Sequence, residues 1–207
     1  SELGLIEPLT HALEAQNYTT PTPIQEEAIP QLLNNADLLG IAQTGSGKTA
    51  AFVLPILQHL TNGKLRPSAK GALVLILAPT RELALQTGVF VSEYAKNLQV
   101  RHTVILGGVN QKRQVKALSR GVDILIATPG RLLDLKKQGH VHLTDVAYLV
   151  LDEADRMLDM GFIKDVRKIV RATPRDRQTL FFSATMPKEV AGLADEILHE
   201  PVRIDIT

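Results

Sequence analysis

Residues 42–49 read Ala42-Gln43-Thr44-Gly45-Ser46-Gly47-Lys48-Thr49, directly after a short apolar run and before a segment with helical spacing. The glycines let the backbone turn tightly, so that its N–H groups converge on the oxygens of a phosphate. The helix that follows adds the positive end of its dipole. A strand, such a loop and a helix in this order predict a phosphate-binding loop in an α/β fold.

Two side chains of this loop carry the expected chemistry. We expect the Lys48 ammonium to neutralise the terminal phosphates of a nucleotide and the Thr49 hydroxyl to bind Mg²⁺. Ala42 departs from the general pattern, which has glycine at this position. The competing interpretation is a flexible Gly/Ser loop that happens to precede Lys48, and the strand-loop-helix context disfavours it.

The rest of the chain alternates short apolar runs with segments of helical spacing. The runs are too short for helices and lack polar alternation, which is typical of strands buried on both faces. This alternation predicts a mostly parallel sheet with helices on both faces, and right-handed crossovers place the binding loops along one edge. The expected strands are residues 38–42, 73–78, 103–106, 124–127, 149–151, 180–182 and 202–206.

Two helical patterns, residues 5–15 and 24–33, precede the first expected strand. We interpret residues 1–36 as a flap packed on the core and residues 37–207 as one α/β domain that contains the phosphate loop. Apolar spacing predicts two further helices, one over residues 162–170 and one over residues 190–197. Residues 62–70 are rich in polar and turn-forming side chains and are expected to form a surface loop.

Composition excludes several classes of protein. The 207 residues include no cysteine, so disulfides, thiolate metal sites and a cysteine nucleophile are excluded. The apolar run 72–78 is far shorter than the ~20 residues of a membrane helix, and no secretory leader is recognisable, so we expect a cytoplasmic protein without membrane contact. The net charge of +1 gives no bulk electrostatic argument for nucleic acid.

A group of carboxylates, Asp152-Glu153-Ala154-Asp155, follows the apolar run 148–151. A carboxylate at the carboxyl end of a strand beside a phosphate loop is where Mg²⁺ is held, so we expect Asp152 to be a metal ligand. Glu153 is placed to orient and deprotonate an attacking water. Alternatively, these carboxylates only favour the N-terminus of the following helix.

These motifs resemble those of the DEAD-box ATP-dependent RNA helicases. Residues 152–155 spell the signature of that family, and the phosphate loop has the family's form, Ala42 included. The likeness covers nearly the whole chain, is strongest to the bacterial RhlE-type branch, and implies the first of two RecA-like domains. Segments similar to the Q motif, motif Ia, the GG motif, motif Ib and motif III follow in order: Pro21-Thr22-Pro23-Ile24-Gln25, Pro79-Thr80-Arg81-Glu82-Leu83-Ala84, Gly107-Gly108, Thr128-Pro129-Gly130-Arg131 and Ser183-Ala184-Thr185.

The resemblance implies that Gln25 selects ATP or ADP, helped by the backbone near Tyr18. The planar amide of Gln25 offers a donor and an acceptor that match adenine N7 and N6. The competing interpretation is an exposed polar residue early in a helix. Asn17 departs from the family, which has glycine there, and the aromatic that stacks on adenine in the family would lie before Ser1.

The resemblance further implies a groove for the RNA backbone. Because its segments follow expected strands, they fall at the carboxyl edge of the sheet. Arg and Thr side chains and backbone N–H groups suit phosphate rather than base edges, so binding is expected to be sequence-independent and salt-sensitive. The competing interpretation is that Thr80, Thr128 and Pro129 are ordinary helix starts. The implied groove residues are Pro79, Thr80, Arg81, Gly107, Gly108, Thr128, Pro129, Gly130 and Arg131.

The hydroxyls of Ser183 and Thr185, at the end of another expected strand, are placed to hydrogen-bond Asp155. The resemblance implies that these three residues couple the nucleotide to the RNA side. From the residues alone, a helix cap before Pro187 is equally consistent.

The resemblance also implies a second RecA-like domain, absent from this chain, whose arginines complete the ATP site. An arginine finger contributes about 10³–10⁵ in rate. We therefore expect this chain, as a monomer, to bind ATP or ADP with Mg²⁺, to hydrolyse ATP very slowly and not to unwind duplexes alone. Two other classes stay open: a DNA-translocating ATPase of the same superfamily and a non-catalytic, ATP-gated RNA clamp.

Overall fold

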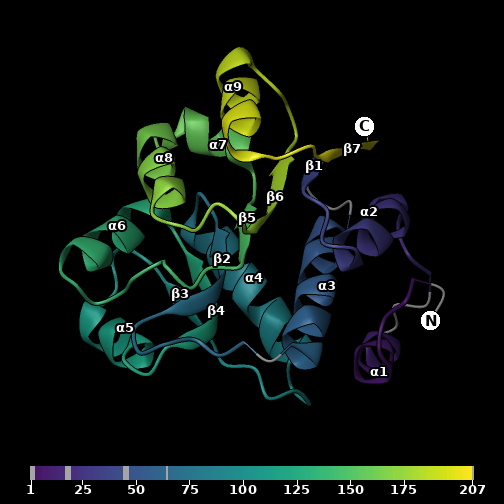
Figure 1. The fold of residues 1–207 in the computed structure, drawn as a ribbon, viewed down its shortest axis with the longest axis horizontal. Helices are drawn as coiled ribbons and strands as arrows, with labels where there is room; N and C mark the ends of the chain where they lie inside the picture. The colour runs from purple at the N-terminus through teal and green to yellow at the C-terminus, as the bar shows by residue number, and fades with distance from the viewer. Residues whose placement is uncertain (1–2, 17–19, 44–46, 64, 207) are drawn as a thin grey trace.

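The computed structural model describes residues 3–16, 20–43, 47–63 and 65–206 (Figure 1). Helices and strands alternate along most of it. In chain order the elements are α1 (Glu7–Ala15), α2 (Pro23–Leu33), β1 (Leu38–Ala42), α3 (Lys48–Asn62), β2 (Ala72–Leu77), α4 (Arg81–Tyr94), β3 (His102–Ile105), α5 (Gln111–Leu118), β4 (Val122–Ala127), α6 (Pro129–Lys137), β5 (Tyr148–Leu151), α7 (Ala154–Asp159), α8 (Ile163–Arg171), β6 (Gln178–Ser183), α9 (Lys188–Ile197) and β7 (Val202–Ile206).

The strands form one parallel sheet in the order β3-β4-β2-β5-β6-β1-β7. The predicted α/β fold with a parallel sheet is confirmed, and each expected apolar run overlaps a strand, although Ala78 and Leu106 lie just beyond the ends of β2 and β3. β6 extends beyond its expected run because polar residues at its ends are buried. Gln178, for example, donates hydrogen bonds to the carbonyls of Leu32 and Ala36, which satisfies its amide inside the protein.

Helices cover both faces of the sheet (Figure 1). Helices α1 to α4 pack on one face and α5 to α9 on the other, so neither face of the central strands meets water. In β2, Val74 and Ile76 belong to the first core, whereas Leu75 and Leu77 belong to the second. This arrangement explains why the strands are continuously apolar instead of alternating.

The helices expected from apolar spacing on the second face are confirmed. In α8, Val166, Ile169 and Val170 are buried, and in α9 Val190 and Leu193 are buried. Residues 65–70 of the expected surface loop belong to no helix or strand, and α3 ends at Asn62.

The segment before β1 shares the core of the first face. Leu9 of α1 and Ile29 of α2 are buried in the same cluster as α3. Gln58 of α3 accepts a hydrogen bond from the Ile6 N–H at 2.7 Å and donates one to the Gly4 carbonyl at 2.9 Å. Residues 3–16 and 20–36 therefore pack firmly against the sheet domain, and the proposed division after residue 36 stays a prediction.

The parallel arrangement brings the carboxyl ends of the strands to one edge of the molecule. The loops after β1, β2, β4, β5 and β6 leave the sheet at this edge, and they carry most of the polar motifs noted above. Within the described residues, no helix is long and apolar enough to span a lipid bilayer.

Candidate functional site

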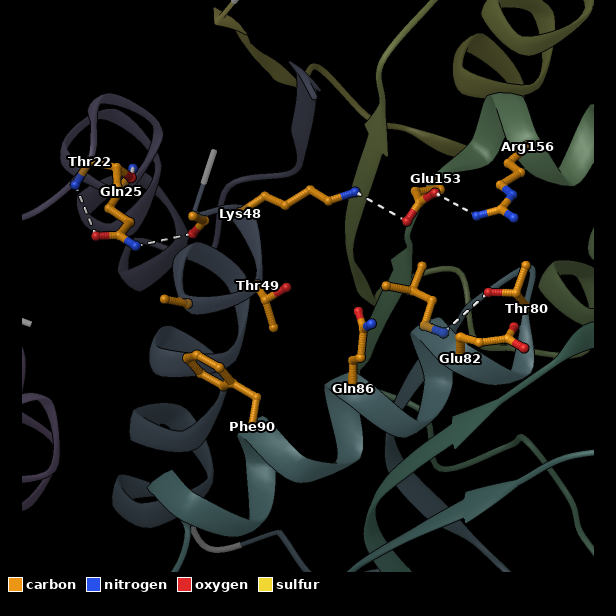
Figure 2. Close-up of a pocket in the computed structure, with 13 residues that line it drawn as sticks. Thr22, Gln25, Lys48, Thr49, Thr80, Glu82, Gln86, Phe90, Glu153 and Arg156 are labelled. Atoms are coloured by element: carbon orange, nitrogen blue, oxygen red, sulfur yellow. Dashed lines mark hydrogen bonds and ion pairs between the residues drawn. The ribbon is translucent and has the colours of Figure 1, made fainter. Parts of the chain in front are cut away.

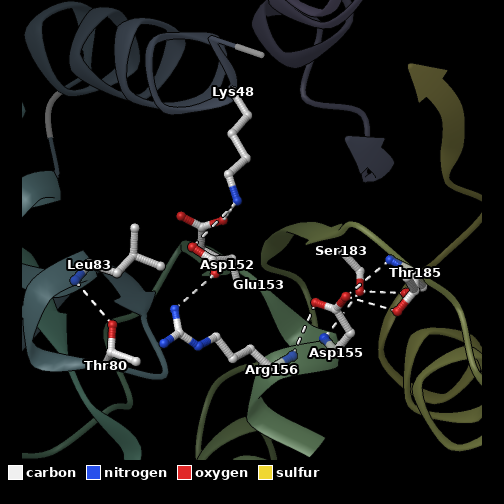
Figure 3. Close-up of polar contacts among 9 residues, drawn as sticks. All are labelled: Lys48, Thr80, Leu83, Asp152, Glu153, Asp155, Arg156, Ser183 and Thr185. Carbon is white, nitrogen blue, oxygen red and sulfur yellow. Dashed lines mark hydrogen bonds and ion pairs between the residues drawn. The ribbon is translucent and has the colours of Figure 1, made fainter. Parts of the chain in front are cut away.

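Lys48 and Asp152 form the centre of the site (Figure 3). Lys48 opens α3, and its Nζ donates a hydrogen bond to Asp152 Oδ1 at 2.7 Å. Both residues are buried, with 5% and 0% of their surface exposed. Helix α3 and the end of β5, 104 positions apart in the chain, thus meet through one ion pair.

Burial governs the electrostatics of Asp152. Loss of solvent raises the pKa of its carboxyl, while the Lys48 ammonium opposes that rise. Its second oxygen, Oδ2, is buried and has no hydrogen-bond partner within the described residues. Since buried polar atoms are nearly always paired, this oxygen has an unused capacity to accept a donor or bind a cation.

Glu153 is held in an unusual backbone conformation. Its φ of 54° and ψ of 54° lie in the left-handed region, which is costly for a residue with a side chain. Its carboxylate lies 3.9 Å from Lys48 Nζ and 3.6 Å from Arg156 Nη1. Although Glu153 occupies the N-cap position of α7, its side chain forms no capping hydrogen bond. Its carboxylate lies between Lys48 and Arg156, and the role of Glu153 toward an attacking water stays a prediction.

Gln25 joins helix α2 to the start of α3 (Figure 2). Thr22 and Gln25 form a capping box, in which Gln25 Oε1 accepts from the Thr22 N–H at 3.0 Å. Gln25 Nε2 donates to the Gly47 carbonyl at 3.1 Å. Gly47 has a φ of +86°, and a Cβ there would lie 2.7 Å from both Gln25 Nε2 and Thr22 Oγ1. Only glycine fits this joint without displacing its neighbours.

A cavity of about 520 Å³ opens between these groups and α4 (Figure 2). Thr49 of α3 faces Gln86 and Phe90 of α4 across it, and Lys48 and Glu153 lie at one end. A volume of this size suits a small-molecule ligand. Sequence reasoning missed the α4 wall, although Glu82, Gln86 and Phe90 recur at intervals of four residues, a spacing that places them on one helical face.

The structure brings Asp155, Ser183 and Thr185 together (Figure 3). Asp155 Oδ2 accepts hydrogen bonds from the Thr185 hydroxyl at 2.8 Å and from the Thr185 N–H at 3.1 Å. The Asp155 N–H donates to Ser183 Oγ at 3.1 Å. These contacts link α7 to the end of β6. Helix α9 begins after Pro187 without a side-chain cap, so the alternative of a helix cap is wrong.

The remaining segments lie at the carboxyl ends of the adjacent strands β2, β4 and β3. Arg81 and Gly108 are neighbours, since a Cβ on Gly108 would lie 3.0 Å from Arg81 Nη1. Arg131 Nη1 donates to the Val109 carbonyl at 3.0 Å. Thr80 caps α4 by accepting from the Leu83 N–H, whereas Thr128 forms no capping bond. Pro79 precedes this cap, Gly107 is half-buried, and Pro129 and Gly130 open α6.

Comparison with known proteins identifies the family. The profile of the DEAD/DEAH box helicases matches residues 22–193. The chain belongs to the DEAD/DEAH box helicase family. It is 46% identical over 205 residues to the ATP-dependent RNA helicase dbp2 of Aspergillus fumigatus, covering 99% of this chain and 38% of that protein. A protein of the same name from Encephalitozoon cuniculi is 45% identical, covering 98% of this chain and 41% of its own length.

Solved structures with a similar fold support the same family assignment. The crystal structure of a DEAD box protein from Methanococcus jannaschii superimposes with a TM-score of 0.91 at 39% identity, covering all of this chain and 55% of that one. The crystal structure of a hypothetical ATP-dependent RNA helicase from Sulfolobus tokodaii superimposes with a TM-score of 0.87 at 32% identity. The match covers 96% of this chain and 56% of that one. This DEAD/DEAH box helicase chain spans about two fifths of the curated relatives it matches. Its assignment to the RhlE-type branch stays a prediction.

Part of the predicted nucleotide contact of this helicase chain lies outside the described residues: Tyr18, Thr44, Gly45 and Ser46. Of the rest of the loop, Ala42 is buried at the end of β1 and Gln43 is exposed. Arg156 was not expected at the site, yet it pairs with Glu153 and lines the cavity. No sequence signal pointed to it, because a surface arginine in a helix is commonplace.

Proposed function

We propose that this chain is the ATP-binding domain of an ATP-dependent RNA helicase and that it binds ATP or ADP with Mg²⁺. The observation that carries the proposal is the buried Lys48–Asp152 pair with Glu153 beside it, where Lys48 and Glu153 form one end of a cavity large enough for a small-molecule ligand. The family membership and the names of the relatives support the same function.

The residues present fit a magnesium ion. Mg²⁺ is usually bound by one or two carboxylates together with phosphate oxygens and waters. Asp152 Oδ2 has no hydrogen-bond partner within the described residues, and Thr49 lines the cavity together with Lys48, the partner of Asp152 Oδ1. We infer that these two residues hold the ion, which would neutralise charge on the phosphates of a bound nucleotide.

Lys48 and Glu153 have different roles: Lys48 contacts phosphate and Glu153 accepts a proton. The Lys48 ammonium is paired with Asp152, and its position in the lining of the cavity places it to contact terminal phosphates. The Glu153 carboxylate is placed to accept a proton from the attacking water. Arg156 holds this carboxylate from the other side and acts as a positioning residue.

Gln25 retains the capacity to bind adenine. Its amide carbonyl uses one acceptor site on Thr22, and its NH₂ group uses one donor on Gly47. One donor and one acceptor site remain, and adenine N7 and N6 complement them. Because the same amide holds the start of α3, base recognition and the shape of the phosphate site are coupled through this side chain.

We infer that RNA binds by its sugar-phosphate backbone along the carboxyl ends of β2, β3 and β4. Arg81, Gly108 and Arg131 lie close together there, and their groups suit phosphate oxygens. The contact of Asp155 with Ser183 and Thr185 provides a connection between the nucleotide site and the adjoining strand end. A second RecA-like domain would supply the arginines that complete the ATP site.

The test is ATP turnover by the protein that contains this chain and the second domain, with matched RNA and DNA. We expect RNA to stimulate turnover, and Glu153→Gln to retain nucleotide binding and reduce turnover by at least about 10²-fold. The isolated chain should hydrolyse ATP very slowly.

Three other results would contradict the proposal, and each indicates a different alternative. Unchanged turnover by Glu153→Gln contradicts the role of this residue as the base. Equal stimulation by DNA indicates a DNA-translocating ATPase. Retention of RNA with an ATP analogue, but no unwinding at any concentration, indicates an RNA clamp.

A further inference from the structure

A group of cationic side chains without ion pairs in the described part of the chain lies at the amino ends of the strands, away from the proposed nucleotide site. A cavity of about 850 Å³ opens there between the starts of β3 and β4 and the end of α5. Its lining includes Arg101, Arg113, Lys116 and Arg120 and no Asp or Glu. We call these four residues the basic groove. All four are exposed, and none forms an ion pair within the described residues.

The charge is concentrated locally. Residues 101–120 contain five Lys and Arg and no Asp or Glu, although the whole chain has a net charge of only +1. The nearest acid in sequence, Asp123, accepts a hydrogen bond from the backbone N–H of Arg101 at 2.8 Å. It is absent from the lining of the groove.

Helix electrostatics explains only part of this pattern. Cations in the last turn of a helix complement its negative end, which accounts for Lys116 and for Arg120 just beyond it. Arg113 lies in the first turn of α5, where a cation is unfavourable. Arg101 directly precedes strand β3, so the dipole of α5 does not account for it. Arg113 and Lys116 are three residues apart on α5 and share one side of the helix. Arg120, just beyond the helix, lines the same cavity.

We propose that the basic groove is a second binding site for the phosphate backbone of single-stranded RNA. This inference rests on the proposed function. Helix α5 begins three residues after Gly108, and its eight residues lead about 12 Å from the carboxyl edge to the groove. Since a single strand carries one phosphate for each nucleotide, a stretch of only a few nucleotides covers that length. No Phe, Tyr or Trp lines the groove, so it reads backbone charge instead of stacking on bases.

Oligouridylates with a 5′ fluorophore, of about 6 and about 20 nucleotides, test the proposal by anisotropy over a salt series. For Arg113→Gln/Lys116→Gln/Arg120→Gln, we expect about tenfold weaker binding of the longer RNA at low salt. The slope of log K against log salt should fall by about 2, at about 0.7 for each lost phosphate contact. Binding of the shorter RNA should stay within about twofold of that of the wild type.

The matched control is Lys164→Gln/Lys168→Gln/Arg171→Gln, which removes the same charge from exposed positions on α8. It should bind both RNAs like the wild type. If both triple variants bind the longer RNA like the wild type, the proposal is wrong, and the cations only protect edge strand β3 from pairing with other chains. If the wild type binds neither RNA, the proposed RNA function fails as well.

A second measurement keeps the proposal testable if the triple variant does not fold. The longer RNA, with 4-thiouridine near one end, is photo-crosslinked to the wild type and the modified peptide is identified. Crosslinks within residues 100–103 or 113–122 support the basic groove. Crosslinks confined to the segments that follow β2, β3 and β4 contradict it.

Discussion

At the scale of single residues, Lys48 and Asp152 decide both the stability and the chemistry of the site. The carboxylate of Asp152 is fully buried, and Lys48 is the only cation that forms an ion pair with it within the described residues. A buried pair of this kind contributes little net stability, but removing one partner leaves an uncompensated charge.

We therefore predict that Lys48→Ala lowers the free energy of unfolding by about 3 kcal/mol and also weakens nucleotide binding. Urea denaturation and calorimetry measure the two effects. The control is Lys188→Ala, because Lys188 also opens a helix but is exposed and forms no ion pair within the described residues. Equal stability of the two variants would show that Asp152 does not depend on Lys48.

Gly47 provides a second prediction at this scale. Its positive φ and the closeness of Thr22 and Gln25 leave no room for a methyl group. Gly47→Ala should cost about 2 kcal/mol of unfolding free energy, since the left-handed conformation alone costs about 1–2 kcal/mol. Gly192→Ala, inside α9 with open space around it, should be neutral or stabilising. Thermal denaturation of both variants is the measurement. A Gly47→Ala protein as stable as the wild type would contradict the claim that Thr22 and Gln25 leave no room for a side chain at position 47.

At the scale of elements, two loops at the amino ends of the strands are joined by Asp145. Its Oδ2 accepts hydrogen bonds from the Ser68 hydroxyl at 2.6 Å and the Ser68 N–H at 2.9 Å. These bonds, with a smaller contribution from His142, hold the pKa of the Asp145 carboxyl below its ordinary value. A lowered carboxyl pKa means that the stabilisation is present above the unfolded-state pKa and is lost as the pH falls through the folded-state pKa.

We predict that Asp145→Asn lowers the melting temperature at neutral pH and that the difference from the wild type shrinks below about pH 4. Melting curves across this range provide the measurement. Asp195→Asn, at an exposed position of α9 that forms no ion pair within the described residues, is the control. A difference that is constant with pH would indicate that the Asp145 charge plays no part in joining the loops.

The sequence predicted the elements well because their signals are local. Continuous apolar runs marked the strands, and four-residue spacing marked α8 and α9. The ends of β6 were missed because Gln178 and Ser183 are polar, and only tertiary contacts explain their burial. The wall formed by Glu82, Gln86 and Phe90 was missed because an amphipathic pattern does not tell which neighbour a polar face meets.

At the scale of the whole molecule, the parallel sheet separates two edges, and each of them carries a proposed site. The carboxyl ends of the strands carry the proposed nucleotide and RNA sites, and the amino ends carry the basic groove. The sequence predicted that the motifs would share an edge, because parallel strands require it. It did not predict the strand order or the pairing of residues 48 and 152, since local patterns carry no information on distant partners. The second domain, the monomeric state and the cytoplasmic location stay predictions.

The central claim is that this chain binds an adenine nucleotide through its phosphate loop and Gln25. Calorimetry with ADP and GDP, in the presence of Mg²⁺, tests it most directly on the wild type, Gln25→Ala and Thr22→Val. The Thr22 variant is the matched control, because it breaks the capping box but keeps the Gln25 amide. We predict that ADP binds and GDP does not, and that Gln25→Ala alone removes this difference. Failure of the wild type to bind either nucleotide would contradict the account.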